Sequence, residues 1–290
     1  MILFSCNHGS DPAQPDPAYQ DSLISWRQNR VRELTMSDGW LALAGRYWLK
    51  EGEQSFGAGR GNDIIFPGGT CPDTIGWINL TDDRIFIRIK NGTDVRYEGQ
   101  PIDVISMITD RDDKQTYLTL GSLKWHIIKR GDRFALRLTD SNSKSLREFR
   151  GLEYFPVDPS WCIPAQYVPY DPPKTLLIAT VIGTVDTLSA PGYLSFQVGR
   201  KAFRLDPVQE PGSGSLFIIF ADETTAVETY GGGRFLDASL PDEDGNVILD
   251  FNKAYNPPCA FTEFATCPLP PDQNKLAISI TAGEKSYSAH

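Results

Sequence analysis

The amino-acid sequence predicts a mainly β fold: an N-terminal helix, a small antiparallel β-sandwich, and then a second β-rich, barrel-like domain. The 290 residues include 25 glycines and 21 prolines, which suit short strands joined by tight turns rather than a helical bundle. Short β-favouring runs recur from Trp40 onward, whereas only residues 18–36 carry apolar side chains at helical spacing.

The predicted helix spans residues 18–36. Asp16 and Pro17 suit its start, because one caps a free N–H and the other has a φ that is already helical. We expect Arg27, Arg30 and Arg32 on the solvent side. The opposite, apolar stripe consists of Leu23, Ile24, Trp26, Val31 and Leu34.

The helix and the sandwich together form the first predicted domain, residues 18–150. Its β-rich runs are separated by turn signals such as Asn91-Gly92. In the segment 84–90, Ile85, Ile87 and Ile89 share one face, while Phe86 lies among charged residues on the other. This alternation is typical of a strand with one buried face, and many such strands indicate a sandwich.

A Pro-rich connection, residues 151–173, separates the sandwich from the second domain, residues 174–290. We expect this second domain to carry the functional site. Its first strand is predicted at 174–184, followed by runs at 192–198, 201–205, 215–221, 247–251 and 275–281.

Charge and hydropathy exclude two classes of partner. The net charge is -9, the pI is about 4.9, and no run of lysine or arginine is present, so we expect no nucleic-acid partner. No apolar stretch approaches the roughly 20 residues that cross a bilayer. Any membrane contact is therefore predicted to be made through a lipid anchor.

The N-terminal residues suggest such an anchor. Leu3-Phe4-Ser5-Cys6 resembles a bacterial lipobox, in which Cys6 is the lipidated residue, and the polar, Pro-rich residues that follow suit a spacer. Residues 1–17 are thus predicted as a lipoprotein-like anchor and spacer, and the protein as a periplasmic or outer-surface lipoprotein of the cell envelope. No charged start precedes Leu3, which leaves open an arbitrary apolar N-terminus and a cytoplasmic location.

The cysteines fit an oxidising compartment. Apart from Cys6 the chain has Cys71, Cys162, Cys259 and Cys267, an even number. Cys259 and Cys267 lie eight residues apart, and a disulfide between them would contribute at most roughly 2–3 kcal/mol. Four reduced cysteines are the alternative. No C-x-x-C motif or nearby histidine indicates zinc, so we predict no metal site.

Several strings resemble an uncharacterised family, the domain of unknown function 1684. They are GWLALAGRYWL (39–49), SFGAGRGNDIIFP (55–67), YGGGRFLDA (230–238), LDFNKAYNPPCAF (249–261), ATCPLPP (265–271) and AGEK (282–285). The resemblance covers nearly the whole chain from the helix onward and implies a full-length member. It implies no reaction, so no catalytic roles are carried over.

The predicted sandwich is also weakly similar to forkhead-associated domains. Phe56-Gly57, followed by Asp63-Ile64 and Pro67, follows part of their pattern. Those domains read phosphothreonine through an arginine, but Ala58 stands at that position here. Without this charge-assisted donor a phosphate reader loses most of its anion affinity, so the resemblance indicates the fold and not the function.

The most unusual local string is Tyr230-Gly231-Gly232-Gly233-Arg234. Three glycines let the backbone approach a ligand, and the Arg234 guanidinium fits a carboxylate or phosphate. No Gly-Lys-Ser/Thr follows, so the string is not a P-loop. The alternative is a glycine corner in which Arg234 pairs with Asp237 or Asp250.

The loop 250–267 is the second candidate segment. Asp250, Asn252, Tyr255 and Asn256 offer hydrogen-bonding groups, and prolines stiffen the loop that holds them. Its alternative role is a rigid plug at the end of a barrel. Glu284 and Lys285 end the last predicted strand, where they either meet this loop or are simply solvated.

Histidine usage restricts the catalytic options. Of the three histidines, His8 lies in the spacer and His290 is the last residue, so only His126 lies inside the predicted fold. A Ser–His–acid triad or a multi-histidine metal site therefore has at most one candidate histidine in the predicted fold, His126.

The preferred hypothesis is an exported module that binds a small molecule or envelope partner through Arg234 and the loop 250–267. One alternative is a hydrolase that uses Asp250 and Glu284 as paired carboxylates with Arg234. Another is a cofactor-binding barrel, for example for a flavin, although no cofactor is assigned.

Overall fold

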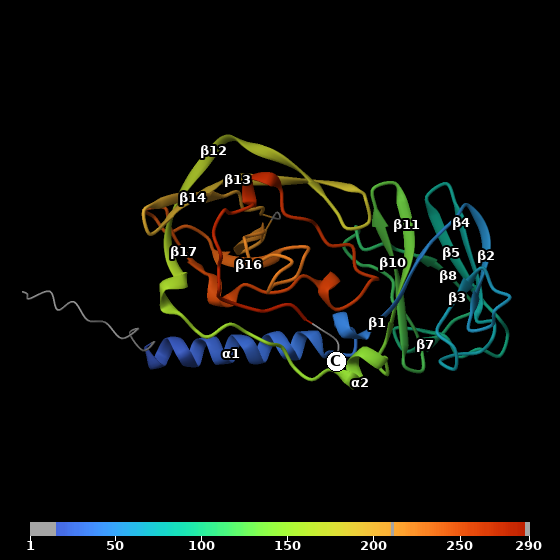
Figure 1. Cartoon of the computed structure of the whole chain (residues 1–290). Coiled ribbons are helices and arrows are strands. Elements are labelled where there is room, and N and C mark those ends of the chain that lie inside the picture. The colour runs from blue at the N-terminus through green and yellow to red at the C-terminus, as the bar shows by residue number, and fades with distance from the viewer. Residues whose placement is uncertain (1–15, 210–211, 288–290) are drawn as a thin grey trace, which may run out of the picture.

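The computed structural model describes residues 16–209 and 212–287. The predicted anchor at Cys6 lies outside these residues and stays a prediction. The described chain is mainly β, as expected. A sandwich lies at one side, a long curved sheet at the other, and helix α1 runs beneath the curved sheet (Figure 1).

Helix α1 (Pro17–Leu34) confirms the predicted helix. Asp16 caps it by accepting a hydrogen bond from the Ala18 amide at 3.3 Å. The buried face was predicted only in part: Leu23 and Leu34 are buried, but Ile24 is 52% exposed and Arg30 is buried. The placement of Arg30 in solvent was wrong because a buried carboxylate, Glu284, pairs with it.

Two sheets form the predicted sandwich. The six-stranded sheet has the order β1-β11-β10-β9-β6-β7 and the five-stranded sheet the order β3-β2-β4-β5-β8. All their pairs are antiparallel except the short pair β2–β3. The strand bounds are β1 (Leu43–Trp48), β2 (Gly52–Gly57), β3 (Ile64–Ile65), β4 (Gly76–Thr81), β5 (Arg84–Ile89), β6 (Arg96–Tyr97), β7 (Gln100–Pro101), β8 (Val104–Met107), β9 (Leu118–Leu120), β10 (Leu123–Arg130) and β11 (Arg133–Asp140).

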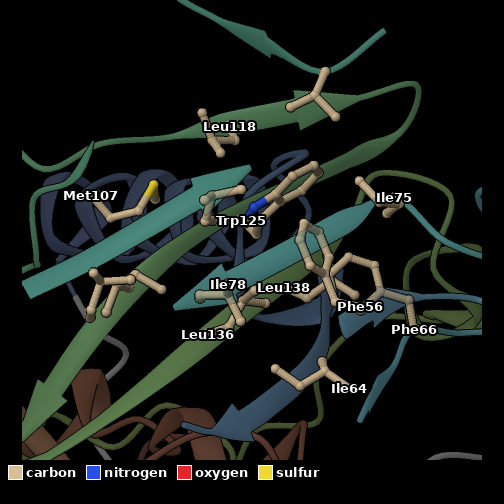
Figure 2. Close-up of a cluster of buried hydrophobic side chains, with 14 of the residues drawn as sticks. Phe56, Ile64, Phe66, Ile75, Ile78, Met107, Leu118, Trp125, Leu136 and Leu138 are labelled. Carbon is tan, nitrogen blue, oxygen red and sulfur yellow. The ribbon is translucent and has the colours of Figure 1, made fainter. Parts of the chain in front are cut away.

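The sandwich core lies between these two sheets. Figure 2 shows Phe56, Phe66 and Trp125 packed together, with ring centroids 5.6–6.0 Å apart. The alternation in β5 is as predicted, with its three isoleucines buried and Phe86 exposed. A short helix, α2 (Lys144–Glu148), follows the last strand of the sandwich.

A four-stranded sheet, β14-β13-β12-β17, curves over the C-terminal part, and a separate pair, β15–β16, lies inside the curve (Figure 1). Together they give the barrel-like part that the sequence predicted. The strands are β12 (Cys162–Ala179), β13 (Val185–Val198), β14 (Lys201–Leu205), β15 (Ser215–Phe220), β16 (Arg234–Ser239) and β17 (Asn246–Asp250). Short 3-10 turns follow β17 at Phe251–Lys253, Pro258–Ala260 and Asp272–Asn274. Two others lie earlier in the chain, Trp40–Ala42 before β1 and Pro159–Trp161 before β12.

Strand β12 begins inside the segment that was predicted as a Pro-rich connection. It pairs with β17 only as far as Gln166, so the later part of the strand, with its prolines, forms ladder hydrogen bonds with a single neighbour, β13. The register with β13 shifts between Pro169 and Lys174, where a bulge accommodates prolines that cannot donate to the ladder. No helix in the described part of the chain is both long and apolar enough to cross a membrane.

Candidate functional site

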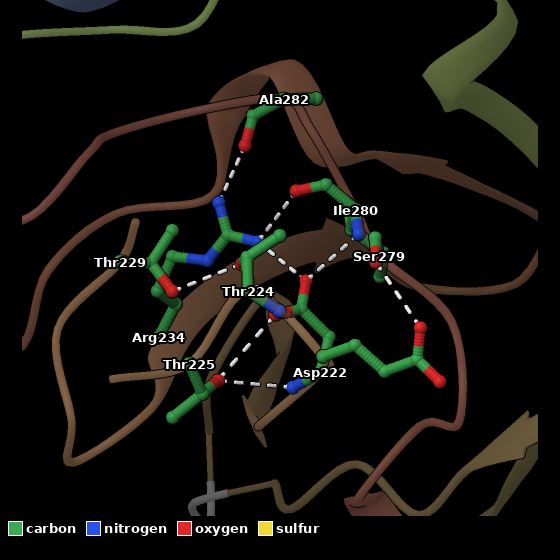
Figure 3. Close-up of polar contacts among 9 residues, drawn as sticks. Asp222, Thr224, Thr225, Thr229, Arg234, Ser279, Ile280 and Ala282 are labelled. Carbon is green, nitrogen blue, oxygen red and sulfur yellow. Dashed lines mark hydrogen bonds and ion pairs between the residues drawn. The ribbon is translucent and has the colours of Figure 1, made fainter. Parts of the chain in front are cut away.

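Arg234, the first residue of β16, lies in the interior with 1% of its surface exposed. Its Nη2 donates to Asp222 Oδ2 at 2.7 Å and to the Ile280 carbonyl at 3.0 Å, and its Nη1 donates to the Ala282 carbonyl. Figure 3 shows Arg234 joining the segment around Asp222 to residues 280–282. The partner is thus Asp222, rather than Asp237 or Asp250.

Asp222 is itself fully bonded. Its Oδ1 accepts from Thr224 Oγ1 at 2.6 Å, and its Oδ2 accepts from the Ile280 amide at 3.2 Å (Figure 3). Burial lowers the pKa of Arg234, and the Asp222 carboxylate opposes that shift. A buried pair with all these bonds made supports the fold and leaves the guanidinium no edge for a ligand.

The glycines before Arg234 turn the chain sharply. Gly233 has φ +83°, and a Cβ there would overlap with Pro270 and with the Phe220 carbonyl, so this position requires glycine. Gly231 is different, since its nearest neighbour would be the Ala226 side chain at 3.5 Å. Tyr230 precedes the turn and donates to the Cys259 carbonyl at 3.1 Å.

These glycines line a cavity of about 690 Å³, which we call the glycine groove. Its other walls are the second half of β12 and the segment 269–275. The walls are mixed in character: Leu176, Leu269 and two prolines are apolar, and two lysines carry charge. The lining consists of Lys174, Thr175, Leu176, Leu177, Ala179, Ala221, Thr225, Gly231, Gly232, Gly233, Leu269, Pro270, Pro271, Asp272, Gln273 and Lys275.

Asp250 and Asn252 attach neighbouring segments to the end of β17. Asp250 accepts from the Tyr19 hydroxyl at 2.9 Å and pairs with Lys253 at 3.2 Å. Burial and this carboxylate raise the pKa of Tyr19. The Asn252 side chain accepts a hydrogen bond from the Asp158 amide at 3.1 Å and donates one to the Asp158 carbonyl at 2.8 Å, so it binds both backbone groups of one residue.

Asn256 and Glu284 form a second buried cluster with helix α1. Glu284 is fully buried, and its two oxygens accept from Arg30 Nε at 3.1 Å and from the Asn256 amide at 2.8 Å. Burial raises the pKa of Glu284, and Arg30 opposes the shift. Asn256 Nδ2 donates to the Lys285 carbonyl at 2.7 Å, while the Lys285 ammonium lies 4.9 Å from the Phe155 ring centroid.

The carboxylates of Asp250 and Glu284 do not meet. They contact Tyr19 and Arg30, which are eleven residues apart in α1, a separation of about 16 Å along the axis of a helix. Paired catalytic carboxylates of glycoside hydrolases lie roughly 5–10 Å apart. The geometry therefore offers these two residues no shared substrate.

Tyr255 lines an aromatic cavity of about 460 Å³, together with Trp26, Trp40, Phe217 and Phe235. Its hydroxyl donates to Asp237 Oδ2 at 2.9 Å, and the Arg30 guanidinium lies 4.7 Å from its ring centroid. Burial, with Asp237 adding to it, raises the pKa of Tyr255. The hydroxyl and one face of the Tyr255 ring are thus already engaged by the protein.

Cys259 and Cys267 are brought together, as the sequence predicted, and both are free thiols in this structure. The contact is reciprocal: the Cys259 amide donates to Cys267 Sγ at 3.1 Å, and the Cys267 amide to Cys259 Sγ at 3.3 Å. A hydrogen bond from Cys267 lowers the pKa of Cys259, and the same bond raises that of Cys267. The predicted disulfide stays a prediction.

Several residues that organise this region gave no signal in the sequence. Tyr19 and Arg30 lie on a helix, and Asp222 and Asp158 lie in ordinary turns, so only the fold shows what they contact. A charged residue at a helical position that also carries apolar neighbours, as Arg30 does beside Leu34, is the one available hint. The described residues contain no cluster of histidine, cysteine or acidic side chains suited to a metal ion.

Comparison with known proteins adds a family and no activity. The family model described as "Protein of unknown function (DUF1684)" matches residues 147–285. The similar strings at 39–49 and 55–67 lie outside this range. A solution NMR structure of an uncharacterized protein from Haloarcula marismortui is 32% identical, covering 49% of this chain and 80% of that chain, with a TM-score of 0.41. None of the curated proteins matches this chain.

Proposed function

The chain belongs to the DUF1684 family through residues 147–285, and we propose that this part is a binding module whose site is the glycine groove. The proposed ligand is a small amphipathic acid. The observation that carries the proposal is the groove itself, a cavity of about 690 Å³ whose mixed walls include leucines, prolines and two lysines. All its lining residues belong to the family-matched part.

The size and walls of the groove suit a small molecule. Small-molecule sites span roughly 300–1,000 Å³ and are lined mainly by apolar groups with a few polar ones. Leu177, one of the lining residues, is 71% exposed, so an apolar ligand that covered it would bury surface that is otherwise in water. These features support a ligand with an apolar body.

The two lysines support an acidic group at one end of that ligand. Lys275 pairs with Asp272 at 2.7 Å, but the two side chains are 59% and 95% exposed. Such a pair contributes at most about 1 kcal/mol, so a ligand carboxylate can replace Asp272 at little cost. Lys174, 3.5 Å from the buried Asp206, lies in the same lining.

The glycine turn supports a close approach of the ligand to the backbone. Gly231 and Gly232 present no side chain to the groove, while Arg234 is turned inward and holds the strand that follows. In this proposal the ligand contacts the glycines, and Arg234, which follows Gly233 directly, fixes the turn through its bonds to Asp222 and to residues 280 and 282.

Isothermal titration with octanoate tests the proposal, with 1-octanol as the probe that lacks the acid. We expect octanoate to bind with a dissociation constant below about 1 mM and octanol at least about tenfold more weakly. Gly231→Leu places a side chain in the groove and should abolish binding. Gly68→Leu, at a turn of the sandwich with no neighbour within 4 Å, is the matched control and should bind as the wild type does.

Either of two results would overturn the proposal: no octanoate binding by the wild type, or unchanged binding by Gly231→Leu. Equal affinity for octanol and octanoate would show that the groove does not recognise the acidic group, and would contradict that part of the proposal. Native and denatured intact masses of the purified wild type give an independent readout, because a retained ligand appears as a discrete increment that Gly231→Leu should lack.

A further inference from the structure

A row of basic side chains crosses the outer face of the six-stranded sheet. Arg137 on β11 lies directly opposite His126 on β10 and directly opposite Arg46 on β1. Arg46 and Arg137 carry like charges that face each other across the two strands, which is destabilising, and neither has an ion-pair partner among the described residues. Such an arrangement is typical of a site that receives an anion.

A cavity of about 260 Å³ opens over this row, and we call it the Arg137 pocket. Trp40 and Tyr117 provide flat walls, and Gln115 provides a polar one. The complete lining is Asp38, Gly39, Trp40, Leu43, Asp110, Gln115, Tyr117, Lys124, His126, Arg137 and Thr139. None of these residues belongs to the family-matched part or to the glycine groove.

Arg137 is the unusual member of the lining. Only 9% of its surface is exposed, yet neither Nε nor Nη2 has a hydrogen-bond partner among the described residues. These two nitrogens share one edge of the planar guanidinium, the edge that binds a carboxylate with two parallel hydrogen bonds. An unpaired charge at this depth is costly, which favours a partner anion.

The other charges around the pocket are already paired. Lys124 contacts Asp38 at 2.8 Å, and Arg130 contacts Asp110 at 2.7 Å. Burial and Arg130 lower the pKa of Arg137 to about 10, so the guanidinium keeps its charge at neutral pH. Among the residues that line the pocket, Arg137 is therefore the one charged side chain without a carboxylate partner in the described part of the chain, and a monoanion would pair with it.

A second unpaired group, on Gln115, restricts the chemical class of the ligand further. The side-chain oxygen of Gln115 is buried and has no donor among the described residues. It can only accept, so a ligand that satisfies it must carry an N–H or O–H group. Burial and Arg137 lower the pKa of His126 to about 4, so the imidazole is neutral at pH 7 and adds no charge.

We propose that the Arg137 pocket is a second binding site, for a small monocarboxylate that also carries a hydrogen-bond donor. The carboxylate bonds to the Nε–Nη2 edge of Arg137, and the donor bonds to Gln115. The proposal does not depend on the glycine groove, because the two sites share no residue.

Glycolate, acetate and inorganic phosphate are the probes, titrated into the full chain while the arginine Nε–Hε signals are followed by NMR. Glycolate has the carboxylate and the donor, acetate lacks the donor, and phosphate carries more charge. We expect saturable glycolate binding in the millimolar range and acetate binding several-fold weaker. Arg137→Met should weaken glycolate at least about tenfold.

Two further variants make the assignment specific. Gln115→Ala should lower glycolate affinity to that of acetate and leave acetate unchanged. Arg133→Met is the matched control, since Arg133 lies on the same strand but stacks on Trp48 outside the pocket. This variant should change neither the glycolate affinity nor the acetate affinity. Circular dichroism of each variant establishes that it is folded.

Three results would overturn the proposal. The first is the absence of saturable binding of glycolate by the folded wild type. The second is glycolate binding that folded Arg137→Met retains in full. The third is tighter binding of phosphate than of glycolate, which would assign the pocket to phosphoryl groups instead.

Discussion

Arg234 and Asp222 illustrate how much a buried ion pair depends on its surroundings. Taking both charges out of water is costly, and here the cost is offset because two backbone carbonyls, an amide and a threonine hydroxyl complete the pair. Removing one partner leaves the other charge buried and uncompensated, so the two residues act as a unit.

Asp222→Asn is therefore expected to lower the free energy of unfolding by about 3–5 kcal/mol. Urea denaturation followed by tryptophan fluorescence measures this change. Glu53→Gln is the comparison: its partner is Arg88 at 3.2 Å, but the two side chains are 54% and 50% exposed, so the loss should stay below about 1 kcal/mol. Equal losses for the two variants would show that Arg234 does not depend on Asp222.

At this scale the structure shows contacts within the protein for residues that the sequence offered as ligand-binding candidates. Arg234, Asn252, Asn256 and Glu284 were singled out as ligand-binding candidates, and each is 0–1% exposed and bonded within the protein. A polar residue in a loop looks the same in sequence whether water, a ligand or another segment satisfies it. The glycines differ, because their missing side chains leave space on the groove side.

Among the elements, the turn before β16 combines two different requirements within three glycines. Gly233 adopts a positive φ and packs against Pro270, whereas Gly231 has an ordinary backbone and faces the groove. Within this string, Gly233 is thus required by the fold, whereas Gly231 belongs to the proposed binding site.

Substitution separates these two roles. Gly233→Ala should cost at least about 2 kcal/mol, because a left-handed alanine is strained and its Cβ overlaps with Pro270. Gly231→Ala should change stability by less than about 0.5 kcal/mol. Thermal unfolding of both variants is the measurement, and a Gly233→Ala protein as stable as Gly231→Ala would contradict the assignment of the turn.

Strand β12 shows where local patterns stop being informative. The alternation in β5 predicted its buried face correctly because one period describes the whole strand. In β12 four prolines interrupt that period, and the sequence therefore predicted a connection up to residue 173. The strand persists because its proline-rich half has a single neighbour and a bulge, and both are properties of the sheet rather than of the segment.

For the whole molecule, helix α1 connects parts of the C-terminal region that are distant from one another. Tyr19 contacts the end of β17, and Arg30 contacts both Glu284 and the Asn256 carbonyl, the latter at 2.7 Å. The sequence predicted the helix but grouped it with the sandwich, since nothing local indicates which surface a helix covers.

Arg30→Met should make stability depend on pH in a defined direction. Burial already raises the pKa of Glu284, and loss of Arg30 raises it further, so folding then favours the protonated acid. Stability should be greatest below the unfolded pKa of about 4.3 and should fall as the pH rises through the folded pKa. Urea midpoints of the variant at about pH 5 and about pH 8 test this sign.

The double variant Arg30→Met with Glu284→Gln is the matched control. It also lacks the Arg30 guanidinium, but it no longer has the carboxyl group that titrates. Its midpoints should differ between the two pH values by no more than those of the wild type. A single variant that is more stable at high pH than at low pH would contradict the placement of Glu284 as an acid buried against α1.

The contact between Arg30 and Glu284 also determines when this protein can finish folding. The two residues are 254 positions apart, so α1 leaves the ribosome long before its buried partner does. During synthesis the sandwich can form from residues that have already emerged, whereas Leu23 and Leu34 of α1 stay in water until the segment around Glu284 arrives. The apolar face of α1 is therefore among the last parts of the described chain to be buried, and until then it is a surface that a chaperone can bind.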